Sequence, residues 1–248
     1  MPRKQIDLAG EFIYKGSELD LFLLATNWKN YWFSIISPLI GQSVLEVGAG
    51  IGTTAKLFSD AKVKKWIAIE PDLSLVNRIK KDFEYTKYPN NFEIHAKTSK
   101  SFSSKYKFDT ILYIDVLEHI KDDKDELDII SKLLIPGGRI IILSPAHNFL
   151  YSPFDLSIGH FRRYNRKSLL AVKPKGFKVE KIYYLDSVGM LASLGNKLFL
   201  KSKLPSTRQI QFWDKGLIPI SCILDRLVLH MIGKTIIGVF QVDQKTKH

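Results

Sequence analysis

Residues 44–54 read VLEVGAGIGTT, and the first half of the chain is arranged around this motif. Its apolar beginning predicts a short buried strand over residues 43–47, and three glycines at alternate positions then predict a tight turn. Residues 53–58 predict a helix directly after the turn. Unpaired N–H groups and the dipole at the start of a helix favour a polar or anionic ligand. The motif therefore predicts a nucleotide-type site at the carboxyl end of a first strand.

The spacing of the glycines separates kinds of nucleotide site. The dinucleotide-binding pattern is G-x-G-x-x-G, whereas Gly48, Gly50 and Gly52 follow a G-x-G-x-G pattern with Glu46 ahead of them. A glycine cluster by itself is also compatible with an ordinary strand-to-helix turn. The choice between these interpretations depends on the rest of the chain.

The composition is that of a folded α/β protein. The 248 residues are 45% hydrophobic and 25% charged, which suits one domain with an elaboration. The single cysteine, Cys222, excludes an internal disulfide and a cysteine-based metal cluster, and it fits a reducing, cytoplasmic setting. No signal peptide and no run long enough to span a membrane is evident. We therefore expect a cytoplasmic protein, which could work at the inner face of the membrane.

The positive charge of the chain is unevenly distributed. The net charge is +12, and between residues 160 and 210 the only acids are Glu180 and Asp186 among many lysines and arginines. Such a region could attract a phosphate-bearing acceptor, a nucleic acid or an anionic membrane surface. It could equally be a solvated, lysine-rich surface.

Apolar runs alternate with helical patterns along the chain, which predicts a parallel sheet covered on both faces. The helical patterns begin with an aromatic stripe over residues 16–40, ended by Pro38 and Gly41, which could cap the ligand crevice or simply pack in the core. Further helices are predicted over residues 124–134 and 168–173. The expected strands are 43–47, 65–69, 92–95, 108–114, 140–143, 177–185 and 235–240.

Two more helices are predicted near the end of the chain, over residues 190–200 and 221–232. The second has an apolar face of ordinary width, so we expect that face to pack on the sheet, although an amphipathic helix of this kind could also lie on a bilayer. We expect one domain over residues 1–248. Its parts are a helical cap (1–41), a ligand-binding core (42–145) and acceptor-side loops, helices and the last two strands (146–248).

An acid follows the second strand, about 20 residues after the glycines. A carboxylate at that place can accept both hydroxyl hydrogens of a ribose, which assigns this role to Glu70. The nearby Asp72 suits the N-cap of the next helix, and the two roles are compatible.

The combination of motifs resembles the class I S-adenosylmethionine-dependent methyltransferase family. The resemblance rests on E-x-G-x-G-x-G at 46–52, on Glu70, on DVLEH at 115–119 and on PGG at 136–138. Further motifs resemble a bacterial and archaeal subgroup linked to polysaccharide and lipid-linked glycan synthesis. They are A-x-N-W-x-x-Y-W at 25–32, GHFRRY at 159–164, with its phenylalanine taken as variable, and a closing strand that contains Gly238.

The resemblance implies a Rossmann-like α/β fold with a seven-stranded sheet, mostly parallel, whose last strand is antiparallel beside the sixth. It implies helices on both faces, an N-terminal helical cap and a helical insertion between strands six and seven. The implied donor is S-adenosylmethionine, with S-adenosylhomocysteine as product and no metal. Relatives often bind adenine through an acid after strand three, whereas here the loop reads AKT at 96–98.

The implied roles are specific to single residues. The glycines would make room for the methionine part and the ribose, Glu46 would lie near the methionine amine, and Asp115 and Val116 would line the sulfonium side. The expected cofactor-binding residues are Tyr31, Glu46, Gly48, Ala49, Gly50, Gly52, Thr53, Glu70, Pro71, Ala96, Lys97, Asp115 and Val116.

Methyl transfer is an in-line displacement, so orientation supplies much of the acceleration, and an oxygen acceptor can also need a general base. The candidate bases are His119, His147 and His160, because histidine titrates near neutral pH. Each of them could equally be a structural histidine. Arg163 and Tyr164 adjoin His160 and could hold an anionic group of the acceptor. No spacing typical of metal ligands is present.

Three functions remain open. The first is O-methylation of a sugar, glycan or related small molecule, which could be anionic or lipid-linked. The second is RNA or other nucleic-acid methylation. Enzymes that methylate an amine of a nucleic-acid base commonly carry an Asn/Asp-Pro-Pro-aromatic run after strand four, to hold a flipped base. Here residues 115–118 read DVLE, which argues against this function. The third is a non-catalytic, donor-binding or membrane-associated scaffold. The oligomeric state is left open.

Overall fold

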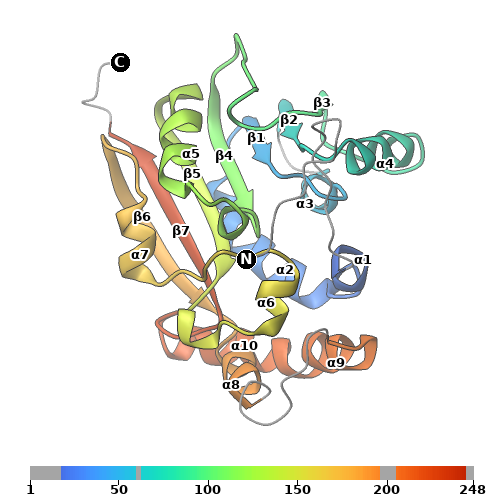
Figure 1. Ribbon diagram of the computed structural model, residues 1–248, viewed down its shortest axis with the longest axis vertical. Coiled ribbons are helices and arrows are strands. Elements are labelled where there is room, and N and C mark those ends of the chain that lie inside the picture. The colour runs from blue at the N-terminus through green and yellow to red at the C-terminus, as the bar shows by residue number, and fades with distance from the viewer. Residues whose placement is uncertain (1–17, 60–62, 196–204, 244–248) are drawn as a thin grey trace.

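A computed structural model describes residues 18–59, 63–195 and 205–243. Its centre is a seven-stranded sheet with the order β3-β2-β1-β4-β5-β7-β6 (Figure 1). The last strand runs antiparallel to both of its neighbours, and the described pairings among β1 to β5 are parallel. The expected Rossmann-like fold is confirmed.

Most strands lie where the sequence predicts them. Two are longer, because β5 includes the PGG turn and pairs with β4 across an irregularity, and β7 continues along β6 to Val242. The strands are β1 (Ser43–Val47), β2 (Lys65–Ile69), β3 (Phe92–His95), β4 (Phe108–Ile114), β5 (Leu134–Pro145), β6 (Phe177–Leu185) and β7 (Thr235–Val242).

Helices cover both faces of the sheet and bury one apolar cluster on each. One cluster contains side chains of α5 and α7, and the other contains side chains of α2, α3, α4 and α10. The helices of the first two-thirds of the chain are α1 (Glu18–Phe22), α2 (Thr26–Ile36), α3 (Thr53–Leu57), α4 (Leu73–Phe83), α5 (Asp123–Ile130), α6 (Pro153–Ser157) and α7 (Arg166–Ala171). Short 3-10 turns are η1 (Ser37–Leu39), η2 (Leu117–His119), η3 (Ser131–Leu133) and η4 (Asn148–Leu150).

The helix expected over residues 16–40 is divided into α1 and α2. The cause lies far along the chain, because the Asp214 carboxylate accepts hydrogen bonds from the backbone N–H groups of Asn27 (3.2 Å) and Trp28 (2.8 Å). These N–H groups belong to the first turn of α2, so the carboxylate caps a new helix there. The expected start at residue 16 lies outside the described residues.

The last helices form one end of the molecule (Figure 1). They are α8 (Ser187–Gly195), α9 (Thr207–Phe212), a π-helical turn η6 (Trp213–Leu217) and α10 (Ile218–Leu227). The second half of the helix expected over 190–200 lies outside the described residues. The helix expected over 221–232 begins at Ile218 and ends at Leu227, because Leu229 and His230 take positive φ angles of 53° and 55°.

The expectation that the apolar face of this last helix packs on the sheet is wrong. Ile223 is 64% exposed and Leu227 is 73% exposed, whereas Ser221 and Asp225 are fully buried. The Asp225 carboxylate accepts the backbone N–H of Asp186 (2.6 Å). Buried hydrogen bonds, rather than apolar packing, therefore set the orientation of α10. None of the described helices is long and apolar enough to cross a membrane.

Candidate functional site

The glycine turn after β1 lies at the carboxyl ends of three parallel strands. Gly48, Gly50 and Gly52 all have positive φ angles (73°, 56° and 76°), a backbone conformation that residues with a side chain rarely adopt. A Cβ on Gly48 would lie 2.6 Å from the Val116 side chain. Among the described residues, a Cβ on Gly50 would meet only Leu19, at 3.8 Å or more, so they leave open space against this part of the turn.

Glu70 lies at the end of β2, next to the turn. Its carboxylate accepts the backbone N–H of Gly50 (2.9 Å) and of Asp72 (3.0 Å). Burial raises the pKa of Glu70 to about 7. Asp72 in turn caps α4 through the N–H groups of Ser74 and Leu75, as expected. Glu70 thus holds the turn and still lines the neighbouring cavity.

Glu46 lies behind the turn. It is buried and accepts a hydrogen bond from the Trp66 indole N–H (2.8 Å), and burial raises the pKa of Glu46 to about 7. Glu46 and Gly52 are absent from the described residues that line the cavity, so they support the turn from inside the protein.

The DVLEH motif follows β4 and forms the next wall. Asp115 has a φ of 54°, and burial raises the pKa of its carboxyl to about 7. Glu118 is fully buried, and its Oε2 accepts a hydrogen bond from the Ser144 hydroxyl (2.6 Å). Its Oε1 has no hydrogen-bond partner in the part of the chain that the structure describes, and it lies 3.8 Å from Nε2 of His160. Burial raises the pKa of Glu118 well above its usual value.

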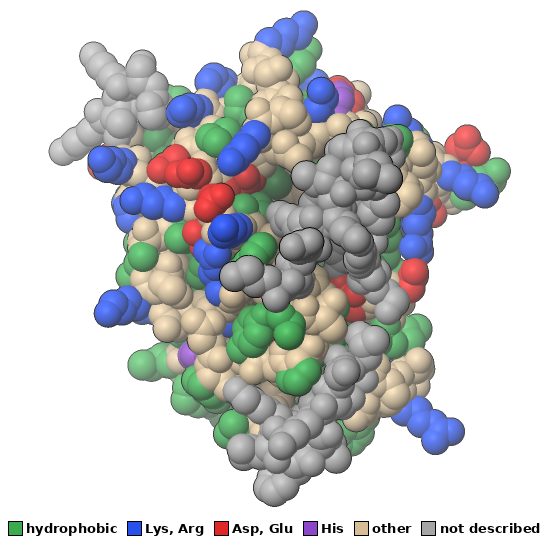
Figure 2. Space-filling model, viewed as in Figure 1, with side chains coloured by type: hydrophobic (Ala, Val, Ile, Leu, Met, Phe, Trp, Pro, Cys, Tyr) green, Lys and Arg blue, Asp and Glu red, His purple; other side chains and the backbone are tan. Residues whose placement is uncertain are grey.

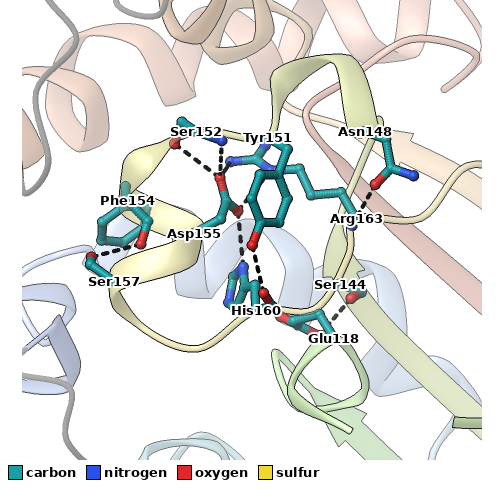
Figure 3. A network of polar contacts seen from close by, with 10 residues as sticks. All are labelled: Glu118, Ser144, Asn148, Tyr151, Ser152, Phe154, Asp155, Ser157, His160 and Arg163. Atoms are coloured by element: carbon teal, nitrogen blue, oxygen red, sulfur yellow. Dashed lines mark hydrogen bonds and ion pairs between the residues drawn. The ribbon is translucent and has the colours of Figure 1, made fainter. Parts of the chain in front are cut away.

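His160 and Asp155 form a buried pair beside Glu118 (Figure 3). The Nδ1 atom of His160 lies 2.9 Å from Oδ1 of Asp155. Burial lowers the pKa of His160, although Asp155 acts in the opposite direction. Burial alone would raise the pKa of Asp155, but hydrogen bonds from His160 and Arg163 hold it below its usual range. The ring of His119 meets that of His160 edge to face, with centroids 4.5 Å apart.

Arg163 faces Asp155. Its Nε and Nη2 atoms lie 2.8 Å and 2.9 Å from the two carboxylate oxygens, a bidentate arrangement. Asp155 is a candidate site residue that the sequence analysis does not identify. A usable signal was present, because Ser152 and Asp155 have the spacing of a capping box, which buries an acid just before the GHFRRY motif.

Several predicted site residues lie away from the described cavity wall. His147 stacks on Tyr184 with centroids 4.9 Å apart, and Tyr164 is buried and donates a hydrogen bond to Asp123 (2.5 Å). Tyr31 donates a hydrogen bond to the Asp225 carboxylate (2.8 Å) and so connects α2 to α10. Of the loop after β3, Lys97 lines the cavity but Ala96 is absent from its wall.

One cavity of about 1590 Å³ joins these features. Small-molecule sites typically measure roughly 300–1,000 Å³, so this volume accommodates two molecules side by side. Predicted residues on its wall are Gly48, Ala49, Gly50, Thr53, Glu70, Pro71, Lys97, Asp115, Val116, His119, His160 and Arg163. Phe22, from the aromatic stripe that could cap the crevice, also lines the cavity, together with Ala192, Phe212 and Trp213, which the sequence analysis does not assign to the site.

Comparison with known families identifies the fold. A family model described as "Methyltransferase domain" matches residues 24–185. This chain belongs to the methyltransferase family. The predicted membership in the S-adenosylmethionine-dependent class is thereby confirmed, with S-adenosylmethionine as its methyl donor.

The names of individual relatives of this methyltransferase indicate different acceptors. A mitochondrial ubiquinone biosynthesis O-methyltransferase of Dictyostelium discoideum is 24% identical over 46% of this chain and 38% of its own. A tRNA U34 carboxymethyltransferase of Geobacter sp. is 27% identical over 54% of this chain and 41% of its own. The methyltransferase thus spans about two-fifths of the length of each of these relatives.

A solved structure supports the fold. The N-methyltransferase NodS of Bradyrhizobium japonicum, in complex with S-adenosylhomocysteine, has a TM-score of 0.55 at 12% identity, with 90% of this chain and 97% of NodS covered. In this methyltransferase the open space at Gly50, the Glu70 carboxylate and the Asp115–Val116 wall fit S-adenosylmethionine, the methylated form of that ligand.

Proposed function

We propose that this methyltransferase transfers a methyl group to a hydroxyl of a sugar, glycan or related small molecule, with His160 as general base. The observation that carries the proposal is the buried His160–Asp155 pair, in which His160 lies on the cavity wall. S-adenosylmethionine supplies a methyl group already activated by the positive sulfonium. The chain must therefore orient the acceptor and remove the hydroxyl proton.

The pair has the geometry of an oriented base. Because Asp155 occupies the Nδ1 side of His160, the proton of the neutral ring belongs on Nδ1, and Nε2 is the atom that accepts a proton. The Asp155 carboxylate also stabilises the imidazolium that forms. Arg163 holds Asp155 through both carboxylate oxygens, so we assign it a positioning role in place of direct acceptor binding.

The charge of the cavity wall does not select an anionic acceptor. Among the described wall residues from the 160–210 region, Arg163 is the only lysine or arginine, and it is paired with Asp155. Lys97, Lys100 and Lys121 line the cavity, but so do several acids, including Asp115 and Glu118. A neutral or weakly charged hydroxyl acceptor is consistent with such a mixed wall. The single cysteine of the chain supports a cytoplasmic setting for the reaction.

The acceptor class is tested by labelling. The protein is incubated with donor carrying a radioactive methyl group and with fractionated cell extract, and the label is followed into glycan, lipid, small-molecule, RNA and protein fractions. We expect label in a glycan, lipid-linked glycan or small-molecule fraction. Label in RNA alone would establish the nucleic-acid function, for which the tRNA-modifying relative is the specific support.

The base is tested on the fraction that accepts label. His160→Gln should lower kcat by roughly 10²–10⁴-fold, the usual contribution of a general base, and leave S-adenosylhomocysteine affinity unchanged. Because burial lowers the pKa of His160 and the neutral ring is the active form, wild-type kcat should rise with pH, with a midpoint below the ordinary histidine value of 6.5, and then level off. His147→Gln is the matched control, since His147 lies away from the cavity wall. A His160→Gln enzyme that keeps wild-type kcat would refute the assignment.

Removal of metal ions gives a separate test. Glu118, His119 and His160 place one possible ligand atom each within 4.8 Å of one another, a set that could hold a divalent cation. With His160 as base, EDTA should leave kcat unchanged. If kcat is lost in EDTA and returns with Mg²⁺ or Zn²⁺, a bound metal ion activates the acceptor hydroxyl, and the assignment of His160 as general base is wrong.

A further inference from the structure

We propose that the end of the molecule formed by α8, α9 and α10 docks on an anionic lipid bilayer. This end carries an exposed apolar surface, which we call the apolar end. Leu227, Leu229 and Met231 are 73%, 77% and 70% exposed. Large contiguous apolar surfaces of this kind mark interaction sites on proteins. The apolar end consists of Leu191, Leu194, Phe212, Ile220, Ile223, Leu224, Leu227, Leu229, Met231 and Ile232.

These side chains come from packed elements. The helices α8 and α10 contact one another, and η6 joins α9 to α10. On α10 the outward residues follow the spacing i, i+3, i+4 and i+7 from Ile220 to Leu227, which places them on one stripe. Figure 2 shows hydrophobic side chains along the lower left edge, at the end where Figure 1 places α8 and α10.

The outward orientation is maintained by buried polar contacts. Besides Asp225, the Ser221 hydroxyl faces inward and donates to Asp186 (2.7 Å). Asp186 also accepts the Trp213 indole N–H (2.7 Å) and lies 3.2 Å from the Lys234 ammonium. Turning the apolar stripe inward would strip these buried carboxylates of their partners, which is strongly unfavourable. The stripe therefore faces solvent as a stable feature of the fold.

The charge around the apolar end selects the partner. Between Ser187 and Gly233 the only acids in the sequence are Asp214 and Asp225, and both are fully buried. The exposed charged residues described in this segment are Arg208, Lys215 and Arg226, all basic. Apolar side chains among cations match an interface with anionic headgroups. A second copy of the chain would bring like charges together in a symmetric interface, which disfavours self-association.

The catalytic cavity reaches the same end. Ala192 of α8 and Phe212 of α9 line its wall, and Phe212 is also 67% exposed. A bilayer at the apolar end would therefore lie close to a wall of the cavity. Delivery of a lipid-linked acceptor from that side rests on the proposed hydroxyl methylation, whereas the docking itself does not.

Co-sedimentation of the full chain with vesicles tests the docking. Vesicles of phosphatidylcholine alone are compared with vesicles of phosphatidylcholine and phosphatidylglycerol, without donor or acceptor. We expect the protein to sediment with the anionic vesicles and binding to weaken with added salt, since exposed charges are screened. Failure to bind anionic vesicles would overturn the proposal, yet it would leave the labelling test of methyl transfer unaffected.

Variants assign the binding to the apolar end. Ile223→Ser with Leu227→Ser should lower the partition coefficient about tenfold or more, because two outward apolar side chains no longer enter the bilayer. Leu73→Ser, which alters an exposed leucine on α4, is the matched control and should bind as wild type. All these side chains are exposed, so thermal melts should be unchanged. Equal binding by the double variant would overturn the assignment. So would a concentration-dependent dimer that the double variant abolishes, because a second copy would then cover the surface.

Discussion

Glu70 shows how one buried side chain can couple ligand binding to protons. Its carboxylate accepts two backbone N–H groups and faces the cavity, while burial raises its pKa to about 7. A ribose diol would donate further hydrogen bonds to the same oxygens, and such bonds favour the ionised form. Donor binding should therefore displace a proton from Glu70 at every pH at which the ligand-free protein is still protonated there.

This coupling predicts the pH dependence of donor affinity. Below about pH 7 the folded protein holds a proton on Glu70 that must leave on binding, so S-adenosylhomocysteine affinity should rise with pH and level off above about 7. Calorimetry in buffers of different ionisation enthalpy measures the proton release directly. Affinity that is flat from pH about 5 to about 8 would contradict a ribose role for Glu70.

Substitution of Glu70 measures its own contribution to ligand binding. Glu70→Gln should weaken S-adenosylhomocysteine binding by roughly 10–100-fold, the loss expected for hydrogen bonds to a charged group, and should remove this residue's proton release. Glu93→Gln, at the exposed edge strand β3, serves as the control and should keep wild-type affinity.

Among the elements, the glycine turn depends on backbone geometry. Gly48→Ala forces a side chain into a positive φ and against Val116, so it should lower the free energy of unfolding by roughly 1–3 kcal/mol and weaken donor binding. In Gly216→Ala the new Cβ meets the Phe212 ring at an ordinary 3.7 Å, and stability should change by less than about 1 kcal/mol. Chemical denaturation compares the two, and equal stabilities would argue against the strained turn.

The contact between α2 and α10 predicts a structural role for Tyr31. Its hydroxyl donates to the buried Asp225 carboxylate, so Tyr31→Phe should cost about 1–3 kcal/mol of unfolding free energy. S-adenosylhomocysteine affinity should stay at the wild-type value, because Tyr31 is absent from the described cavity wall. The opposite result, weaker binding at unchanged stability, would restore the ligand contact that the sequence comparison with the family implies.

Binding of the donor or its demethylated product should stabilise the whole fold, because the ends of β1, β2 and β4 all contribute residues to the cavity wall. S-adenosylhomocysteine at about one hundred times its Kd should stabilise the fold by about 2.7 kcal/mol through mass action. A calorimetric melt should show the higher Tm, and NAD at the same concentration should leave it unchanged. A shift with NAD instead would favour the dinucleotide interpretation of the glycines.

Much of the fold and part of the site follow from neighbours along the chain. The bounds of β1 to β4 and β6 agree with the sequence prediction, as does the cap at Asp72. Strand periodicity, turn glycines and helix caps are local patterns, so they can be read without knowledge of the fold. The same locality explains why many of the predicted donor-site residues, which follow strand ends, lie on the cavity wall.

Long-range partners account for what the sequence does not reveal. Asp155 becomes the partner of His160 and Arg163, Asp214 divides the first helix, and Asp225 turns the apolar stripe of α10 outward. Each is an acid whose role depends on which N–H groups surround it after burial. A buried carboxylate must find donors wherever the chain brings them, and no local pattern encodes that position.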